Sequence, residues 1–405
     1  MMKAKHFKLY CGIIGLVITL PLVLTMANLC FNMVRHTNLI NEPELSGVSV
    51  VPDKPQLSMQ TLCSGTFQSG FEDFFADRLV LRKTMTRAYN QILYTVFHAT
   101  DNSTILVGQD DVLFEKVYAT AYITELSPDS ILALSEQIGK LERLNTLLNE
   151  RGIPLVVRIS PSKAEHYSDF LPNSYSRFVK MKQAGEYGPN WYQAFSSEIQ
   201  KTDIPVYDCY ELFEQMKADG EVVFAKGGTH WSLAPMAEYI NGLNAFMEPL
   251  LNRKLGRMIE DSKEVVIGEM GLLDDSDIWN LCWNTFYAKP NYPSPHISYH
   301  TVAGEAPLRV FTVGQSFTTV LLGAIYGTQP PLWDETYFSW YDARVIQYPS
   351  DVPWGTQISE QTDDFAQYLQ MDVILIDFLE SGDGACQFEF VDHILQYLEG
   401  NEGTT

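Results

Sequence analysis

The stretch from 310 to 320 places a serine between a predicted strand and a predicted helix. Its sequence is V-F-T-V-G-Q-S-F-T-T-V, and the apolar run 308–313 predicts a buried strand. Gly314 ends that strand, and apolar residues recur at helical spacing over 317–326. The first N–H groups of a helix have no partner within it, and the helix dipole favours negative charge there. Ser316 is therefore a candidate nucleophile beside a candidate oxyanion site, although a serine there can also serve only as a helix cap.

The segment 127–163 adds a second unit of the same kind and sets the fold class. It opens with Ser-Pro, a pair of helix start signals, and Gly152 is a stop signal. The apolar run 153–159 predicts a strand buried on both faces, and the loop 160–163 follows it. Alternation of helices and buried strands predicts an α/β fold with a mainly parallel sheet. Sites in such sheets form at the carboxyl ends of the strands.

A serine nucleophile needs a general base, and His230 is the best placed of the eight histidines. It follows the apolar segment 222–225, for which we expect a strand, and precedes a helix that Ser232 is expected to cap. Such a strand would end at the same edge of the sheet as Ser316. The alternative is a histidine that makes only a structural hydrogen bond.

Other elements are predicted along the rest of the chain. They are a helical region at 67–97, a hairpin of 104–107 and 112–114, strands at 204–207 and 373–378, and helices at 210–218 and 388–398. The segment 330–355, rich in Trp, Tyr and Pro, is expected to be a long loop. Its aromatic rings either bind sugars or belong to the core.

The N-terminus carries an apolar run without charge, from Leu9 to Phe31, that is long enough to span a bilayer. Three lysines precede it and predict a cytoplasmic N-terminus. We expect an uncleaved signal anchor, since the sequence T-M-A at 25–27 matches a cleavage site only weakly; a cleaved signal peptide is the alternative. The expected division is a tail and anchor at 1–35, a juxtamembrane linker at 36–66 and an extracytoplasmic domain at 67–405.

Charge and cysteine usage exclude several classes of function. A net charge of −22 argues against nucleic-acid binding. There is no C-x-x-C pair to hold zinc, and the acidic cluster of Asp274, Asp275 and Asp277 lacks the spacing of a calcium loop. We therefore expect neither a metal nor a cofactor. The four cysteines beyond the anchor allow three disulfide pairings or buried free thiols.

Six blocks of the sequence occur together in one order. They are F-E-D-F-F-A-D-R-L-V-L-R from 71, I-L-V-G-Q-D-D-V-L-F from 105, S-P-S-K-A-E-H-Y-S-D-F-L-P from 160, T-H-W-S-L-A-P-M-A from 229, G-E-M-G-L-L from 268 and V-G-Q-S-F from 313. Together they resemble the AlgX/AlgJ and DHHW group of SGNH hydrolase-like proteins, which serve bacterial polysaccharide O-acetylation. In this group the histidine precedes the serine, as His230 precedes Ser316 here.

The resemblance implies an SGNH hydrolase-like three-layer sandwich behind one N-terminal transmembrane helix. It implies O-acetyl transfer to a cell-surface or secreted polysaccharide through an acyl-serine, outside the cell membrane. Because acetyl-CoA is absent there, it also implies a membrane-bound O-acyltransferase partner that exports the acetyl group. The alternatives are a catalytically impaired scaffold or glycan-binding protein, and an acetyl esterase.

The resemblance also assigns roles to residues. Ser316 is the nucleophile and His230 the base, while Gly228 stands where the family has the aspartate that orients the histidine. Asp208 and Asp377, at the ends of predicted strands, are the candidate replacements, and a carbonyl that orients a Ser–His dyad is another solution. The remaining candidates are an oxyanion loop and supporting residues, namely Gly314, Gln315, Ser162, Lys163, Thr229 and Trp231.

Overall fold

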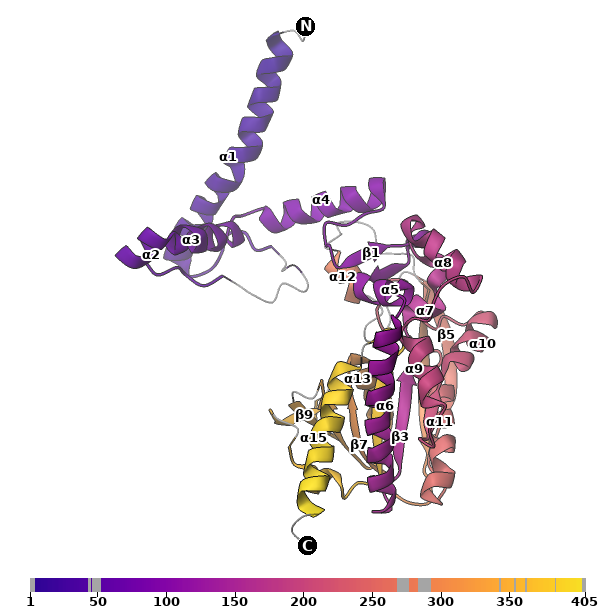
Figure 1. The fold of residues 1–405 in the computed structure, drawn as a ribbon. Helices are drawn as coiled ribbons and strands as arrows, with labels where there is room; N and C mark the ends of the chain where they lie inside the picture. Colours follow the sequence, from indigo (N-terminus) through magenta and orange to yellow (C-terminus); the bar gives the residue numbers. More distant parts are fainter. Residues whose placement is uncertain are drawn as a thin grey trace. The chain divides into compact units, whose positions relative to one another are not determined.

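The computed structural model describes most of the 405 residues (Figure 1). These are 4–42, 45, 52–267, 277–282, 293–341, 344–352, 355–360, 363–382 and 384–402. The G-E-M-G-L-L block and the acidic residues Asp274 and Asp275 lie outside the described residues. The chain divides into two compact units, Met1–Asn102 with Trp279–Ala288, and Ser103–Ile278 with Lys289–Thr405.

The first unit is helical. It contains α1 (Ala4–Arg35), α2 (Met59–Ser64), α3 (Thr66–Asp77) and α4 (Arg82–Phe97), and the boundary between the units falls inside α12 (Asp277–Leu281). Within α1, Leu9–Arg35 is long and apolar enough to cross a membrane, as the sequence predicted. The helical region predicted at 67–97 consists of two helices, because Leu81 adopts a left-handed φ of 71° between them.

The second unit is built around a seven-stranded sheet. Its strands are β3 (Leu155–Ser160), β4 (Val206–Asp208), β7 (Arg309–Gly314), β8 (Glu335–Trp340), β9 (Arg344–Tyr348), β10 (Thr356–Ser359) and β11 (Val373–Leu379). They are ordered β10-β9-β8-β7-β11-β3-β4. The strands from β8 to β4 are parallel, and β9 and β10 add an antiparallel edge. The predicted mainly parallel sheet is therefore confirmed.

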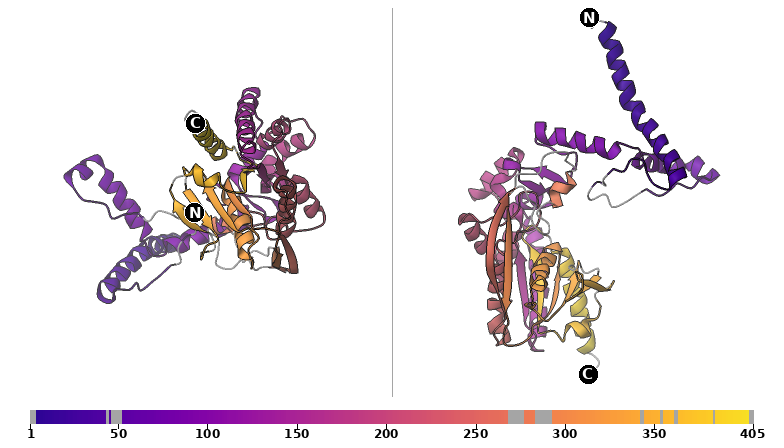
Figure 2. Two further views of the ribbon diagram at one scale, coloured as in Figure 1. Left: turned by 90° about the horizontal axis from the view of Figure 1, so that it is seen from below. Right: turned by 180° about the vertical axis from the view of Figure 1, so that it is seen from behind.

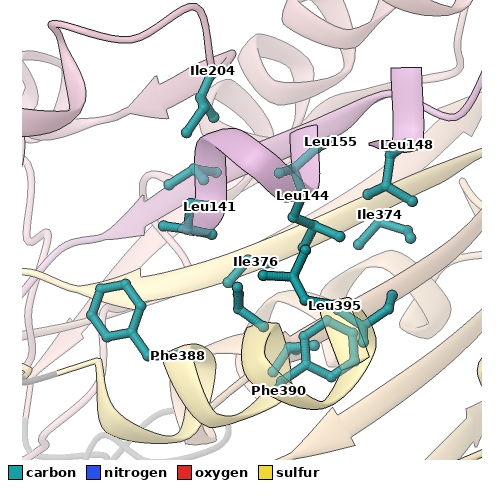
Figure 3. Packing of buried hydrophobic residues seen from close by; sticks show 14 of the residues in the cluster. Leu141, Leu144, Leu148, Leu155, Ile204, Ile374, Ile376, Phe388, Phe390 and Leu395 are labelled. Atoms are coloured by element: carbon teal, nitrogen blue, oxygen red, sulfur yellow. The ribbon is translucent and has the colours of Figure 1, made fainter. Parts of the chain in front are cut away.

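Alternation along the strands gives each face of the sheet its own apolar layer. Helices cover both faces (Figures 1 and 2). One face packs against α6 (Pro128–Asn149), α9 (Trp191–Ile199), α14 (Phe365–Tyr368) and α15 (Ala385–Glu402). Figure 3 shows its centre, where leucines of α6 meet Ile374 and Ile376 of β11 and Phe390 of α15. The other face packs against α10 (Tyr210–Ala218), α11 (Met236–Leu251) and α13 (Ser316–Gly327). The three-layer sandwich follows from this two-residue period.

Smaller elements surround the sandwich. They are α5 (Lys116–Ile123), α7 (Lys163–His166), α8 (Ser176–Gln183), the 3-10 turns Gln109–Asp111, Ser168–Phe170 and Asn173–Tyr175, and two antiparallel pairs, β1 (Ile105–Val107) with β2 (Leu113–Glu115) and β5 (Arg257–Ile267) with β6 (Pro293–Val302). The predicted hairpin at 104–114 is thus confirmed, whereas the long pair β5–β6 was not foreseen. The described cysteines form no disulfide, and Cys209 and Cys282 are buried thiols.

Three expectations from the sequence are wrong. The segment 330–355 is not a long loop, because it contains β8 and β9, and rings such as Trp333 are buried in the core. The segment 222–225 makes only an isolated bridge, Phe224 to Trp231, and no strand of the central sheet. Ser232 does not cap α11: its hydroxyl donates to the Val222 carbonyl, and the helix begins at Met236.

Candidate active site

Ser316 and His230 meet at the N-terminus of α13. Ser316 is the first residue of the helix, with Gln315 as its N-cap in an extended conformation. The Nε2 atom of His230 lies 2.9 Å from the Ser316 Oγ atom. Both side chains are half-buried, so a reactant can reach them. The ring of Phe317 packs against the imidazole, with 4.5 Å between the ring centroids. This geometry suits proton transfer from the hydroxyl to the imidazole.

The turn before Ser316 requires a glycine. A Cβ atom on Gly314 would lie 2.1 Å from the Thr318 hydroxyl oxygen and 3.0 Å from the Asp377 Cβ atom. The close approach lets β11 and the first turn of α13 pack directly against the end of β7. Gly314 therefore serves the packing of the serine turn.

A buried ionic network lies beneath this turn. Asp377 accepts hydrogen bonds from the Arg158 guanidinium and the Thr318 hydroxyl through Oδ2, and from the Ser160 hydroxyl at 2.7 Å through Oδ1. The guanidinium also donates to Tyr239 at 3.1 Å and to Thr318 at 3.1 Å. Both carboxylate oxygens are thereby used, so Asp377 positions α13 through Thr318 and does not orient His230.

Asp208 does not take the orienting role either. Its two oxygens accept from the Tyr192 hydroxyl and the Tyr210 backbone N–H, each at 3.0 Å. It serves the start of α10, because a carboxylate there satisfies one of the unpaired N–H groups of the helix. The two acids that the sequence offered for His230 are both bound elsewhere.

A buried lysine holds the loop that carries His230. The Lys163 ammonium donates to the carbonyls of Ala225, Lys226 and Gly228, at 2.6, 3.0 and 2.8 Å. Lys163 as a whole is only 4% exposed. The ammonium therefore shapes the loop two residues before the histidine, at the position where the aspartate was expected.

The supporting residues flank His230 on both sides. The Thr229 hydroxyl donates to Glu115 at 2.6 Å, which ties the loop to the end of β2. Trp231 is buried and stacks on Phe213 of α10, with 5.4 Å between the ring centroids. The loop is thus fixed by one cation, one hydroxyl and one stacked ring.

Ser162 and Lys163 are not placed as oxyanion donors. The Ser162 backbone N–H donates to Glu380 at 2.6 Å, and its hydroxyl accepts from Ser381. The Lys163 ammonium is committed to the three loop carbonyls. The Thr318 N–H donates to the Gln315 carbonyl at 3.0 Å, so the donors that remain at the start of α13 are the backbone N–H groups of Ser316 and Phe317.

A second cluster of buried charged side chains contacts the loop 160–163, and the sequence did not predict it. His166 contacts Glu214 through Nδ1 at 2.7 Å and Glu380 through Nε2 at 3.2 Å. Burial alone would lower the pKa of His166, but the two carboxylates outweigh it and raise the pKa to about 9. The charged imidazole neutralises Glu380, whose other oxygen holds the Ser162 N–H.

Sequence reasoning missed the roles of Arg158, Thr318 and Glu380. The signal that was available for Arg158 is a lone cation in an otherwise apolar strand, which needs a buried partner.

Among the described residues, no group of three or more His, Cys, Asp or Glu side chains could hold a metal ion.

Residues 105–236 match a family described as ALGX, the SGNH hydrolase-like domain of the acetyltransferase AlgX. This chain contains an AlgX/AlgJ-like domain. The sequence is 25% identical over 187 residues to the probable alginate O-acetylase AlgJ of Pseudomonas aeruginosa, and 22% identical over 174 residues to that of Pseudomonas putida. These matches cover 46% and 42% of the chain, but only 42% and 41% of the relatives' own lengths.

Solved structures with AlgX/AlgJ names are also similar. The O-acetyltransferase domain of Pseudomonas putida AlgJ gives a TM-score of 0.44 at 16% identity, over 73% of this chain and 99% of that one. Pseudomonas aeruginosa AlgX gives 0.43 at 14% identity, over 69% of this chain and 63% of that one.

Changing Gly314 to alanine should damage the serine turn of the AlgX/AlgJ-like domain. The new Cβ atom would push the Thr318 hydroxyl away from Asp377, and we expect the free energy of unfolding to fall by about 1–3 kcal/mol. Gly323→Ala is the control, because a Cβ atom there meets nothing within 4 Å and should be neutral or stabilising. Chemical denaturation measures both, and equal effects would contradict this account of the turn.

Changing Lys163 to methionine should loosen the loop that carries His230. Three carbonyls would lose their charged donor, and we expect the free energy of unfolding to fall by roughly 2–4 kcal/mol. Lys226→Met is the control, since its ammonium donates to the exposed Asp110 carbonyl; its effect should stay within about 0.5 kcal/mol. Similar losses in the two variants would refute the role given to Lys163.

The His166 cluster should make stability fall with rising pH. Its folded pKa of about 9 lies above the ordinary 6.5, so its contribution is complete below pH 6.5 and is lost as the pH rises through 9. Between these values the free energy of unfolding should fall by about 1.4 kcal/mol per pH unit from this group. Urea titrations from pH 7 to 9 should show this slope in the native chain and in His300→Gln, an exposed histidine. The slope should be reduced in His166→Gln, and an unchanged slope there would count against the assignment.

Proposed function

We propose that this protein is a membrane-anchored, extracytoplasmic O-acetyltransferase that acts on a polysaccharide through an acyl-Ser316 intermediate. The observation that carries the proposal is the 2.9 Å contact between His230 and Ser316 at the start of α13. The AlgX/AlgJ-like domain supports a role in polysaccharide O-acetylation. The apolar helix α1 supports membrane anchoring.

In the first half-reaction, His230 Nε2 accepts the Ser316 hydroxyl proton while Oγ attacks the carbonyl carbon of an acetyl ester. The oxygen of the tetrahedral intermediate gains a negative charge beside the first N–H groups of α13 and the positive end of the helix dipole. The intermediate collapses when the bond to the donor alcohol breaks. That alcohol takes the proton back from His230, and acetyl-Ser316 remains.

In the second half-reaction, a sugar hydroxyl replaces the donor alcohol. His230 accepts the hydroxyl proton, the sugar oxygen attacks the acetyl-Ser316 carbonyl, and the bond to Ser316 Oγ breaks as Oγ regains the proton. The product is an O-acetylated sugar. With water in place of the sugar, the same steps make an esterase.

The acetyl donor and the partner follow from the location. A site outside the cell membrane has no acetyl-CoA, so we propose a membrane-bound O-acyltransferase that delivers the acetyl group to Ser316. The anchor α1 would keep the two proteins in one membrane.

A catalytically impaired scaffold or glycan-binding protein is the second candidate. Gly228 stands in place of the aspartate, and Asp208 and Asp377 are bound elsewhere. In a serine protease triad, loss of the orienting acid lowers kcat by about 10⁴. Because neither of these two acids reaches His230 while the base itself is retained, we propose that the Ser–His pair works as a slow enzyme.

Removing the Ser316 hydroxyl should abolish acetyl chemistry. The purified full chain should hydrolyse p-nitrophenyl acetate, and should acetylate an oligosaccharide with the same ester as donor. Ser316→Ala should fall to background, and His230→Ala should lose about 10²–10⁴-fold, the usual contribution of a general base.

Ser135→Ala, on α6 at the opposite face of the sheet, is the matched serine control and should keep the native rate. If Ser316→Ala retained the native rate in both assays, the catalytic proposal would fail and the scaffold would be favoured.

A further inference from the structure

Helix α4 has the reverse of the polarity expected for a helix in a water-soluble protein, because apolar side chains are exposed and a polar one is buried. Its exposed side is apolar, with Met85, Tyr89, Ile92 and Val96 recurring at helical spacing and 41–63% exposed. Its inward side holds Asn90, which is fully buried. A helix that packs on a protein core normally buries its apolar stripe and exposes its polar one. We therefore expect this apolar face to contact an apolar partner and not water.

The buried Asn90 side chain is satisfied within the first unit. The Asn90 amide donates to the Thr86 carbonyl at 3.1 Å, and its oxygen accepts from the Asp101 N–H at 3.1 Å. Tyr94 packs edge-on against Trp279, with 5.2 Å between ring centroids. The orientation of α4 is thus fixed by specific contacts, which hold its apolar face outward.

The charges around α4 differ from those of the rest of the chain. Between 78 and 100 there are four cations and no acidic residue, although the chain as a whole carries −22. The cations are Arg78, Arg82, Lys83 and Arg87. Basic residues beside an exposed apolar stripe are the composition of helices that lie in the surface of an anionic membrane.

Hydrogen bonds tie the start of α4 to the apolar helix α1. The Thr25 hydroxyl of α1 accepts the Val80 N–H at 2.9 Å. Glu42, shortly after α1, accepts the N–H groups of Leu81 and Thr84, each at 2.8 Å, and so caps α4. Thr25 lies in the second half of the candidate span Leu9–Arg35, ten residues before its end, so the start of α4 is held toward one surface of the bilayer that this span would cross.

We propose that α4 lies in the outer surface of the bilayer, with its apolar face in the boundary between headgroups and acyl chains. The cations at its start face the phosphates of anionic lipids. A second copy of the chain would bring the same cations against each other, which disfavours it as the occupant. The inference rests on the anchoring role of α1 and is independent of the chemistry at Ser316.

Photocrosslinking in membranes tests the occupant directly. p-Benzoylphenylalanine is placed at Ile92 of the full chain, and at Leu132 of α6 as the control, because Leu132 is an apolar residue at least as exposed, at 63% against 56% for Ile92. The proteins are reconstituted in vesicles of phosphatidylcholine with phosphatidylglycerol, irradiated and analysed by mass spectrometry. We expect severalfold more lipid adduct at Ile92 than at Leu132.

The other outcomes would overturn the proposal. A dimer adduct at Ile92 would assign the face to a second copy, and a protein adduct formed only in membranes of expressing cells would assign it to a partner. Equal yields of lipid adduct at Ile92 and Leu132 would show that α4 does not lie in the membrane surface. Ser316→Ala should give the native adduct yield, so failure of the acetyl chemistry is distinguished from failure of this inference.

Replacing Arg82 with glutamine tests the role of charge, because its side chain is 44% exposed and its contact with Asp77 is long, at 3.9 Å. The adduct yield at Ile92 should fall in vesicles with phosphatidylglycerol and stay unchanged in phosphatidylcholine alone. Loss of adduct in both lipids, or in neither, would contradict the role given to anionic lipid.

Discussion

The Arg158–Asp377 ion pair is the interaction on which both the sheet and the candidate site depend. Removing two charges from water is expensive, and such a pair persists only when further hydrogen bonds satisfy both groups. Here Ser160, Thr318 and Tyr239 supply such bonds to the carboxylate and to the two terminal nitrogens of the guanidinium, while Arg158 Nε has no partner among the described residues. Loss of either charge would leave the other buried alone, at about 3–5 kcal/mol. Because Thr318 lies in the first turn of α13, the same network fixes the direction of the serine that begins the helix.

The histidine is positioned by different means from the serine. Ser316 stands on a strand and a helix of the central sandwich, whereas His230 lies on a loop outside the sheet. That loop exposes backbone carbonyls to the interior, and buried carbonyls need donors. The Lys163 ammonium satisfies three of them at once. Both β3 and the helix after it thus contribute, Arg158 to the serine side and Lys163 to the histidine side.

Several predictions that rested on residues a few positions apart were confirmed, whereas contacts such as Arg158–Asp377, between residues far apart in the sequence, were not predicted. The turn at Gly314, the start of α6 at Ser127 and the limits of α10 follow from residues a few positions apart, and the structure contains all three. Arg158 and Asp377 are neighbours only because β3 and β11 pair in a particular register, which no local pattern contains. Asp377 therefore looked available to His230. The prediction of a long loop at 330–355 was wrong for a related reason. Its aromatic residues belong to the core because β8 and β9 extend a sheet whose other strands lie far away in the sequence.

Gly228 stands two residues before His230, at the position where an aspartate was expected. An aspartate beside the imidazole has two effects, since it fixes the ring and stabilises the imidazolium that forms when the base accepts a proton. The loop of this chain supplies the first effect through Lys163, the Thr229–Glu115 contact and the stacked Trp231. A cation that binds carbonyls cannot supply the second. Asp208 and Asp377 do not supply it either, because both are bound elsewhere, so under the proposed mechanism the position of the base is the part of the triad that this loop retains.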